Sequence, residues 1–403
     1  MRVLTFTSLF PNSAQPWHGF FVYQRVAHLA RRSGNVVSVV APVPYLPPWI
    51  PVARWRQTRS IPSQELMGQL QTYHPRYFFL PKISMPYHGL LMYAGSLSLV
   101  RRLHEMMNFD CIDAHYVYPD GFAAVLLGKS LGIPVVVSAR GTDMSLFPQF
   151  RLIRPLIRWT LRRAGGVVGV CEALKEAMTN LGTPAEKACV IGNGIDLDRF
   201  EPVNRKDART KLGIPEDAEV VLSVGNLVPV KGYQFLIPAI AQMVPRHPKI
   251  KLYIVGEGVF RKRLEAQAGE EGVRDQIFFM GRKPNENLKY WYSAADVFCL
   301  ASSREGWANV LLESMACGTP VVATRVWGTP EVIVSSEFGV LVEQNKESLA
   351  QGLEYALEKE WNHKALVEYA ATRTWDIVAR EVETFLETRI AAERLVTPGL
   401  SHG

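Results

Sequence analysis

Two glutamates, Glu305 and Glu313, lie eight positions apart in a segment that leads from an apolar stretch at 297–300 into a pattern typical of a helix. The helix is predicted to begin near Asn309, where free backbone N–H groups and the helix dipole suit a diphosphate. One carboxylate then lies at the loop mouth and the other about two helical turns along the same side. Carboxylates accept hydrogen bonds from sugar and ribose hydroxyls. Two incidental glutamates on a solvated helix face would give the same spacing.

Two other polar patterns are candidate sites of chemistry. His115 falls at the end of a predicted strand at 111–114, where α/β sheets place ligand sites. A packed or surface histidine accounts for it slightly better. Asp196 and Asp198 form a DxD pattern of the kind that binds metals, but they lie in the segment that joins two predicted domains. A structural role is favoured for them, and the sequence predicts no metal site.

The elements that position these residues repeat in a βαβα rhythm, which predicts parallel sheets covered by helices. A helix is expected at 24–32, and the proline-rich stretch 42–86 is expected to form long surface loops. Expected strands of the first half are 3–6, 36–40, 111–114, 135–138, 167–170 and 188–191.

The same rhythm restarts after a turn-rich stretch at 193–207, which marks a domain boundary. A helix is expected at 233–243, and the amphipathic segment 361–395 is expected to be helical. Expected strands of the second half are 217–225, 251–255, 277–279, 296–300 and 321–323.

The composition is that of a globular protein, because 48% of the residues are apolar and 21% are charged. A chain of 403 residues is longer than one hydrophobic core usually supports, which predicts two domains. The first ten residues fit a buried strand better than a signal peptide. The longest other apolar stretch, 90–100, is too short to span a bilayer. The five cysteines are an odd number and form no CxxC pair, which argues against a disulfide framework and favours a reducing cytoplasm.

Positive charge is concentrated in the first half of the chain. Residues 1–200 carry 21 Lys and Arg against 11 Asp and Glu, whereas the remainder carries 24 against 27. In the segment 151–163 (RLIRPLIRWTLRR), arginines recur at helical spacing: Arg151, Arg154, Arg158 and Arg162. A basic amphipathic helix suits anionic lipid headgroups, although a surface helix packed on a sheet would show the same pattern. We expect an anionic membrane surface as a partner.

Several segments, in this order along the chain, resemble the large retaining glycosyltransferase family 4, which has the GT-B fold. The strongest is 305–313 (EGWANVLLE) with 314–322 (SMACGTPVV), which resembles the family's E-x7-E signature and the block after it. The resemblance covers nearly the whole chain and is weakest over 42–105. The other matching segments are 119–121, 140–143, 191–196 with Phe200, 223–232, 255–258 and 279–281.

The resemblance implies an α/β protein with two Rossmann-like domains whose parallel sheets face each other across a cleft. Residues 1–195 would form the acceptor-side domain and 205–375 the nucleotide-sugar domain, with the final helix 376–403 packing back on the first. It also implies transfer of a sugar from a nucleotide-sugar donor, with UDP or GDP favoured, to a sugar or lipid-linked acceptor. No cofactor is expected.

The same resemblance assigns roles to individual residues. Lys231 would neutralise the donor diphosphate, Glu305 would bind hydroxyls of the transferred sugar, and Glu313 would bind the ribose. Backbone around Asn309 and Val310 would hold the phosphates, and Gly19 would let the backbone approach the donor. Further expected donor-binding residues are Asn226, Gly256, Gly281, Arg282 and Gly306, and expected catalytic residues are Lys231, Glu305, Arg140 and His115.

Two positions depart from the family pattern. Asn226 stands where an arginine is usual, which removes a bidentate phosphate donor. Arg140 stands where many relatives have histidine, and arginine cannot act as a base because it stays protonated. The acceptor proton would then pass to the departing phosphate.

Two other functions share parts of this pattern. A non-hydrolysing nucleotide-sugar 2-epimerase would have the same architecture without the E-x7-E arrangement, and a carbohydrate- or membrane-binding scaffold could descend from a transferase. Nucleic-acid binding is not predicted, because none of its recognition modules is present. The preferred hypothesis is a metal-independent hexosyltransferase of surface polysaccharide or glycolipid assembly, cytoplasmic and peripherally bound to the inner face of the membrane.

Overall fold

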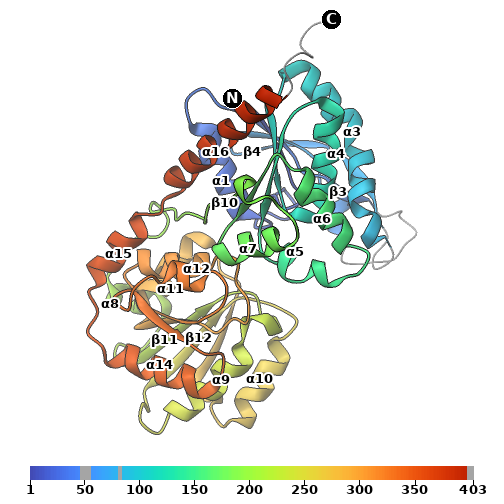
Figure 1. Ribbon diagram of the computed structural model, residues 1–403. Helices are drawn as coiled ribbons and strands as arrows, with labels where there is room; N and C mark the ends of the chain where they lie inside the picture. Colours follow the sequence, from blue (N-terminus) through green and yellow to red (C-terminus); the bar gives the residue numbers. More distant parts are fainter. Residues whose placement is uncertain (46–55, 80–83, 397–403) are drawn as a thin grey trace, which may run out of the picture. The chain divides into compact units, whose positions relative to one another are not determined.

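A computed structural model describes residues 1–45, 56–79 and 84–396 of the chain. It divides into two compact units, Met1–Asn193 together with the C-terminal residues from Trp375, and Gly194–Thr374 (Figure 1). The sequence placed the second domain at 205–375. The segment after Asn193 also belongs to the second unit, because Ile195 forms a β-bridge with Thr374.

The first unit contains an eight-stranded sheet in the order β10-β9-β8-β7-β1-β2-β5-β4, parallel except for the pair β4–β5. The apolar runs seen in the sequence form six of its strands, from the edge strand β10 through to β2. Their bounds are β1 Arg2–Phe6, β2 Val36–Val40, β7 Cys111–His115, β8 Val135–Ala139, β9 Gly166–Gly169 and β10 Ala188–Val190.

The proline-rich stretch does not consist only of loops, so that expectation was wrong. β4 (Gln64–Met67) and β5 (Leu70–Tyr73) form an antiparallel hairpin around Gly68, and β3 (Val43–Tyr45) pairs with β6 (Arg76–Phe78). These strands are short and contain polar residues, so they lack the apolar run that marks a central strand. Residues 46–55 and 80–83 lie outside the described part of this stretch.

Helices cover both faces of the first sheet. α1 (Phe20–Arg31) and α16 (Trp375–Val396) pack together over one face, and α3 (His88–Met107), α4 (Phe122–Leu131) and α6 (Arg154–Arg163) lie over the other (Figure 1). α16 buries Val378, Val382 and Leu386 against β1, β7 and their neighbours. The C-terminal helix therefore completes the core of the first unit. Shorter helices of this unit are α2 Arg56–Arg59, α5 Thr142–Ser145 and α7 Glu172–Asn180.

The basic helix begins later than the arginine spacing suggested. α6 starts at Arg154 with Pro155 in its first turn, where a missing N–H is tolerated, and Arg151 lies in the preceding turn. Ile157 and Leu161 are fully buried within the first unit. The apolar side of this helix therefore covers the core, as in an ordinary surface helix, while the arginines remain exposed.

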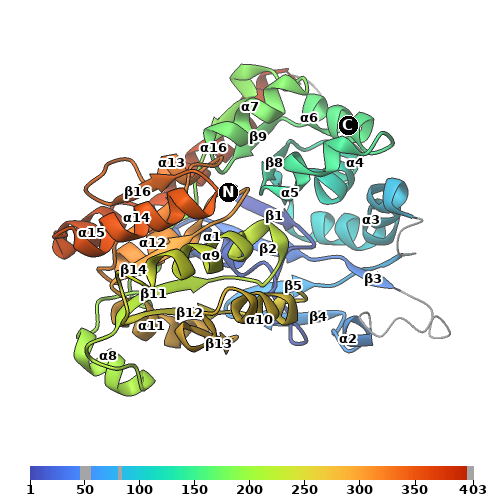
Figure 2. The same cartoon turned by 90° about the horizontal axis from the view of Figure 1, so that it is seen from below.

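The second unit is a six-stranded parallel sheet in the order β13-β12-β11-β14-β15-β16 (Figure 2). Five of its strands were expected, and β16 (Gly339–Val342) was not, because a four-residue run beginning with glycine gives a weak signal. The others are β11 Glu219–Val224, β12 Ile250–Val255, β13 Ile277–Gly281, β14 Val297–Leu300 and β15 Val321–Thr324.

Alternate side chains of this sheet enter two cores, one under each helical layer. α9 (Tyr233–Met243), α10 (Arg261–Glu270) and α14 (Lys346–Glu358) cover one face. The opposite face is covered by α8 Arg205–Leu212, α11 Leu288–Ala294, α12 Asn309–Ala316 and α15 His363–Ala371, and α13 is a short turn at Thr329–Val332. The expected helical segment 361–395 is thus two helices, α15 and α16, broken at 372–374.

Candidate functional site

One edge of the second sheet gathers most of the residues predicted to bind a donor. Because all six strands are parallel, the loops that follow β13, β12, β11 and β14 begin at the same edge, where α/β sheets bind ligands. The ends of these strands, the loops and the helix start that follows β14 carry Gly281 and Arg282, then Gly256, then Asn226 and Lys231, and finally Glu305, Gly306, Asn309 and Val310.

Lys231 and Glu305 form an ion pair at this edge. Lys231 Nζ donates to Glu305 Oε1 at 2.6 Å, and the two side chains are 24% and 12% exposed. The methylene stem of Lys231 passes Gly225, where an added Cβ would lie 3.7 Å from the lysine Cε and 3.2 Å from the Tyr233 hydroxyl. A cation and a carboxylate that the sequence assigned to the same substrate are therefore neighbours.

Backbone contacts hold the two loops of this pair together. Ser303 N donates to Val230 O at 2.8 Å. Gly232, with φ 72°, lies so close to Ala301 that a Cβ would come within 1.8 Å of its carbonyl oxygen. Only glycine fits there. The proximity of Lys231 to Glu305 is thus set by the backbone on both sides.

Glu313 lies further along α12 and has a partner that the sequence did not reveal. Tyr292, fully buried on α11, donates its hydroxyl hydrogen to Glu313 Oε2 at 2.7 Å. Burial raises the pKa of Glu313 to about 7, although the Tyr292 hydrogen bond and Arg199 act in the opposite direction. Near neutral pH this carboxyl can accept hydrogen bonds as an anion or donate one as an acid.

The start of α12, where the sequence predicts an anion site, carries no side-chain cap. The N-cap residue is Ala308, which has no side-chain oxygen to accept from the first amides of the helix. Asn309 and Val310 are the first two helical residues, and both are only partly buried. These N–H groups, with Lys231 on the neighbouring loop, can neutralise a diphosphate.

The remaining predicted donor-binding residues of the second unit include two glycines that the backbone conformation favours and two exposed polar residues. A Cβ on Gly256, with φ 154°, would approach Gly225 O to 1.9 Å, so this glycine is needed for the packing of two loops. Gly281 has φ 69°, which favours glycine as well. Asn226 and Arg282 are exposed.

Gly19, His115 and Arg140 belong to the first unit. Gly19 caps the start of α1 with φ 63°, and a Cβ there would lie 2.2 Å from Leu9 O. Its own backbone packing explains the glycine without a ligand. His115 ends β7 and Arg140 follows β8, so both lie at the carboxyl edge of the first sheet.

His115 and Arg140 join a buried charge network. Arg140 Nη2 donates to His115 Nδ1, and His115 Nε2 lies 3.2 Å from Asp113 Oδ2. Because arginine can only donate, the His115 proton is on Nε2, facing Asp113. Asp113 also binds Arg25 at 3.2 Å, and Arg25 donates to Ser138 at 2.9 Å.

The protonation of this network follows from its burial. Burial lowers the pKa of His115 to about 3, against the opposing effect of Asp113, so the ring is neutral. Burial and the neighbouring Arg25 lower the pKa of Arg140 to about 9, which leaves it protonated at neutral pH. Burial alone would raise the pKa of Asp113, but the opposing effects of Arg25 and His115 are larger, so the pKa of Asp113 lies below its usual value. His115 therefore positions Arg140, and its ring is enclosed by protein.

Sequence reasoning missed Tyr292, Arg25 and Asp113 as supporting residues. Arg25 is an arginine on the otherwise apolar side of α1, and that misplaced charge was the available signal for a buried ion pair. Asp120 was noted only as part of a motif. It is fully buried, accepts from Ser8 N, and burial raises its pKa to about 7.

Two family models match the chain. The one described as Glycosyltransferase Family 4 matches residues 19–199, and the one described as Glycosyl transferases group 1 matches 204–373. A D-inositol 3-phosphate glycosyltransferase of Thermobispora bispora is 30% identical over 325 residues, which cover 74% of this chain and 75% of that protein. The chain belongs to glycosyltransferase family 4.

Other relatives of this family 4 glycosyltransferase agree. The putative teichuronic acid biosynthesis glycosyltransferase of Bacillus subtilis is 27% identical over 370 residues, 90% of each chain. Sucrose-phosphate synthase from Thermosynechococcus elongatus matches with a TM-score of 0.78 at 21% identity, over 97% of this chain and 99% of that one. Anabaena HepE in complex with UDP matches with a TM-score of 0.72 at 20% identity, over 96% and 100%. The predicted GT-B fold is confirmed.

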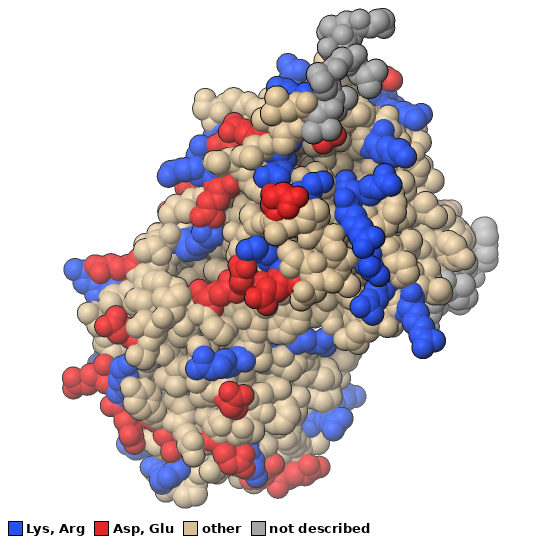
Figure 3. Space-filling view, in the orientation of Figure 1, with Lys and Arg blue, Asp and Glu red and all other residues tan. Residues whose placement is uncertain are grey.

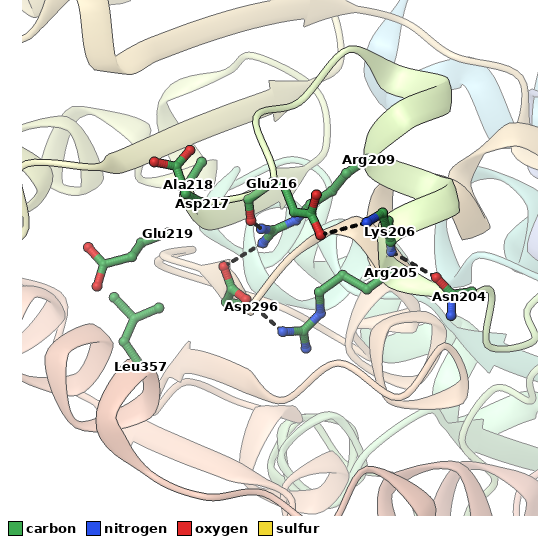
Figure 4. Close-up of a pocket in the computed structure, with 10 residues that line it drawn as sticks. All are labelled: Asn204, Arg205, Lys206, Arg209, Glu216, Asp217, Ala218, Glu219, Asp296 and Leu357. Atoms are coloured by element: carbon green, nitrogen blue, oxygen red, sulfur yellow. Dashed lines mark hydrogen bonds and ion pairs between the residues drawn. The ribbon is translucent and has the colours of Figure 1, made fainter.

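A cavity of about 610 Å³ lies away from these residues, at the edge where β11 and β14 of the glycosyltransferase begin (Figure 4). The charged side chains that line it are engaged in ion pairs. Asp296 binds Arg205 and Arg209, each at 2.8 Å, and Arg209 also donates to Glu216 O at 2.6 Å. These ion pairs fix α8 to the sheet, so we assign the cavity a structural role.

Asp196 and Asp198 lie in the segment after Asn193, within the second unit. Among the residues that the structure describes, no group of three or more His, Cys, Asp and Glu side chains could hold a metal ion. The described helices likewise include none that is long and apolar enough to cross a bilayer.

Proposed function

We propose that this family 4 glycosyltransferase transfers a sugar from a nucleotide-sugar donor to a sugar or lipid-linked acceptor, with retention of anomeric configuration. The observation that carries the proposal is the ion pair between Lys231 and Glu305 beside the start of α12, with Glu313 eight residues further on. This arrangement offers a cation and amides for a diphosphate and two carboxylates for hydroxyls.

In the proposed reaction, the bond between the anomeric carbon and the donor's phosphate oxygen breaks. Lys231 and the first amides of α12 stabilise the negative charge that develops on the diphosphate. The acceptor oxygen bonds to the anomeric carbon on the face from which the phosphate leaves, and the departing phosphate oxygen takes the acceptor's proton, so the anomeric configuration is retained. Charge stabilisation thus comes from protein groups, and we propose that no divalent metal is required.

Surface polysaccharide or glycolipid assembly is the proposed setting. The B. subtilis relative is described as acting in teichuronic acid biosynthesis, and HepE was solved with UDP. On this basis UDP is the first donor nucleotide to test, followed by GDP. Family membership removes the epimerase alternative. The intact set of Lys231, Glu305 and Glu313 favours an enzyme over a scaffold.

An anionic membrane surface is the proposed location of the acceptor. Arg154, Arg158 and Arg162 are exposed on α6, and Figure 3 shows basic side chains in a column over the part of the first unit where Figure 1 places α6. Leu152 is 70% exposed beside them. We propose that exposed aromatic side chains of the proline-rich stretch 42–86 support this contact. Tyr45 and Phe78 are exposed, while Trp49 and Trp55 lie outside the described residues.

A thermal-shift panel of UDP, GDP, ADP and dTDP on the full chain tests the donor proposal. A ligand at 100 times its Kd stabilises the folded protein by about 2.7 kcal/mol, so a binder raises Tm clearly. We expect one nucleotide to do so. The corresponding nucleotide sugar is then incubated with lipid-linked acceptor fractions, and no shift with any of the four nucleotides would refute the proposal.

A further inference from the structure

We infer that the Lys231–Glu305 ion pair makes the donor site discriminate between an intact nucleotide sugar and a free nucleoside diphosphate. The inference rests on the proposed donor site. In the absence of a donor, the ammonium that would bind the diphosphate is already bound to the carboxylate that would bind the sugar, at 2.6 Å. Any diphosphate must compete with Glu305 for Lys231.

The pair is a built feature of the site. The loop after β11 and the loop after β14 are joined by the hydrogen bond from Ser303 to Val230, and by the close approach of Gly232 to Ala301. These contacts flank Lys231 directly. A backbone hydrogen bond of 3.2 Å from Gly328 N to Glu305 O also holds the backbone of Glu305 in place. The backbone contacts therefore keep residues 231 and 305 close together, while rotation of the Lys231 side chain can bring its ammonium to another partner.

The nucleotide sugar and the free nucleoside diphosphate differ in the hydrogen-bond donors that they offer to the Glu305 carboxylate. A nucleotide sugar carries hydroxyl groups that can donate to the carboxylate as Lys231 turns to the diphosphate, so both charges remain solvated by hydrogen bonds. A free nucleoside diphosphate takes Lys231 and offers Glu305 nothing. Because that side chain is only 12% exposed, leaving it without a donor is costly. The pair therefore weakens product binding more than donor binding and promotes release of the diphosphate after transfer.

The test is calorimetric binding of UDP, GDP, ADP and dTDP to the full-length protein and to three variants, Glu305→Gln, Lys231→Met and the double variant. Glu305→Gln removes the competitor with little change of shape. We expect it to bind the nucleoside diphosphate about 5-fold or more tightly than the wild type, the scale of a lost polar partner at a part-buried site. The same variant should lose transferase turnover, so affinity and activity move in opposite directions.

The double variant separates competition from simple charge removal. If Glu305 acts through Lys231, Glu305→Gln tightens binding only when Lys231 is present, and the two substitutions are non-additive. Equal tightening in the Lys231→Met background would show a general electrostatic effect and overturn the inference. Unchanged or weaker binding to Glu305→Gln would overturn it as well. If neither the wild type nor Glu305→Gln bound any of the four nucleotides, the donor site itself would be refuted. Thermal unfolding of each variant verifies that it is folded.

Discussion

Tyr292 and Glu313 form a hydrogen bond of 2.7 Å between a fully buried hydroxyl on α11 and a carboxylate oxygen on α12. The hydroxyl is fixed as a donor, since burial raises the pKa of Tyr292 well above its usual value. One oxygen of Glu313 is therefore engaged by protein, which orients the carboxylate for a ligand hydroxyl at the other. Tyr292 acts through Glu313 and is a positioning residue in the proposed donor site.

This relationship predicts a pH dependence for nucleoside diphosphate binding. The pKa of Glu313 is raised to about 7, so the carboxylate that accepts from ribose forms as pH rises through 7. Affinity measured by calorimetry should increase by about 10-fold between pH 6 and pH 8, following the ionised fraction. Glu313→Gln removes this titration and leaves only that of the phosphate. A wild-type profile as flat as that of Glu313→Gln would contradict the assignment.

Tyr292→Phe should shift the same profile. The hydroxyl favours the ionised form of Glu313, so its loss moves the pKa of Glu313 upward and the binding midpoint with it. We expect weaker binding at pH 7, by about 3- to 10-fold, and recovery at pH 9. Tyr290→Phe, on the same helix and in contact with Lys211, is the matched control. A loss of affinity that is equal at every pH would indicate a packing defect instead.

Removing either member of the ion pair should impair catalysis. Lys231→Ala and Glu305→Ala are each expected to lower kcat by about 100-fold or more, the usual scale for one preorganised electrostatic contact. Glu313→Ala should act mainly on KM for the donor. Lys249→Ala is a suitable control, because Lys249 pairs with Asp217 at the opposite edge of the sheet. Normal turnover by Glu305→Ala would remove the basis of the proposed site.

Asn226→Arg tests whether this position still faces the diphosphate. Asn226 is exposed in the loop after β11, five residues before Lys231, so a longer side chain can be accommodated. We expect tighter donor binding, because arginine can donate to phosphate through two parallel hydrogen bonds. Asn226→Gln adds length without charge and should change little. Unchanged affinity in both variants would place position 226 outside phosphate reach.

The course of transfer can be checked directly. If Lys231 and the amides of α12 supply the charge, EDTA should leave turnover unchanged, and NMR should show the donor's anomeric configuration in the product. Inhibition by EDTA that manganese or magnesium reverses would require a metal in the mechanism. An inverted product would contradict same-face transfer.

The sequence predicted those parts of the molecule that depend on local pattern. β12 and α9 lie within a residue of their expected bounds, since an apolar run or a 3.6-residue period determines each. The order of the loop motifs also located Lys231 and Glu305. The β4–β5 hairpin and β16 were missed, because short polar or glycine-containing strands depend on their neighbours for stability.

Contacts between residues far apart along the chain could not be predicted from the sequence. Tyr292 and Glu313 are 21 residues apart, and Arg25 and Asp113 are 88 apart, so no spacing rule connects them. The sequence left two roles open for the basic segment, a lipid-binding helix and a surface helix packed on the sheet. The arginine spacing suggested one continuous basic helix from Arg151, whereas burial of Ile157 and Leu161 assigns its apolar side to the core.

The remaining prediction concerns the membrane. Because the apolar side of α6 is buried, attachment has to come mainly from its exposed arginines and from Arg151 and Leu152 in the turn before it. Each basic residue near an anionic surface contributes on the order of 1 kcal/mol. Replacing Arg151, Arg154, Arg158 and Arg162 with glutamine should therefore release the protein from anionic vesicles in a co-sedimentation assay. Wild-type binding should also fade as salt rises, since the Debye length is about 8–10 Å near physiological ionic strength.

The control for this experiment removes the same charge elsewhere. Lys206, Lys249, Lys262 and Lys364 are exposed in the second unit, and their replacement with glutamine lowers the net charge by an equal amount. Binding should survive that change if α6 is the contact surface. Hydrolysis of free nucleotide sugar should persist in the arginine variant, while transfer to a lipid-borne acceptor falls. Equal loss of binding in both variants would show an effect of net charge alone. Equal binding of the wild type to neutral and anionic vesicles would leave α6 as a cover for the sheet.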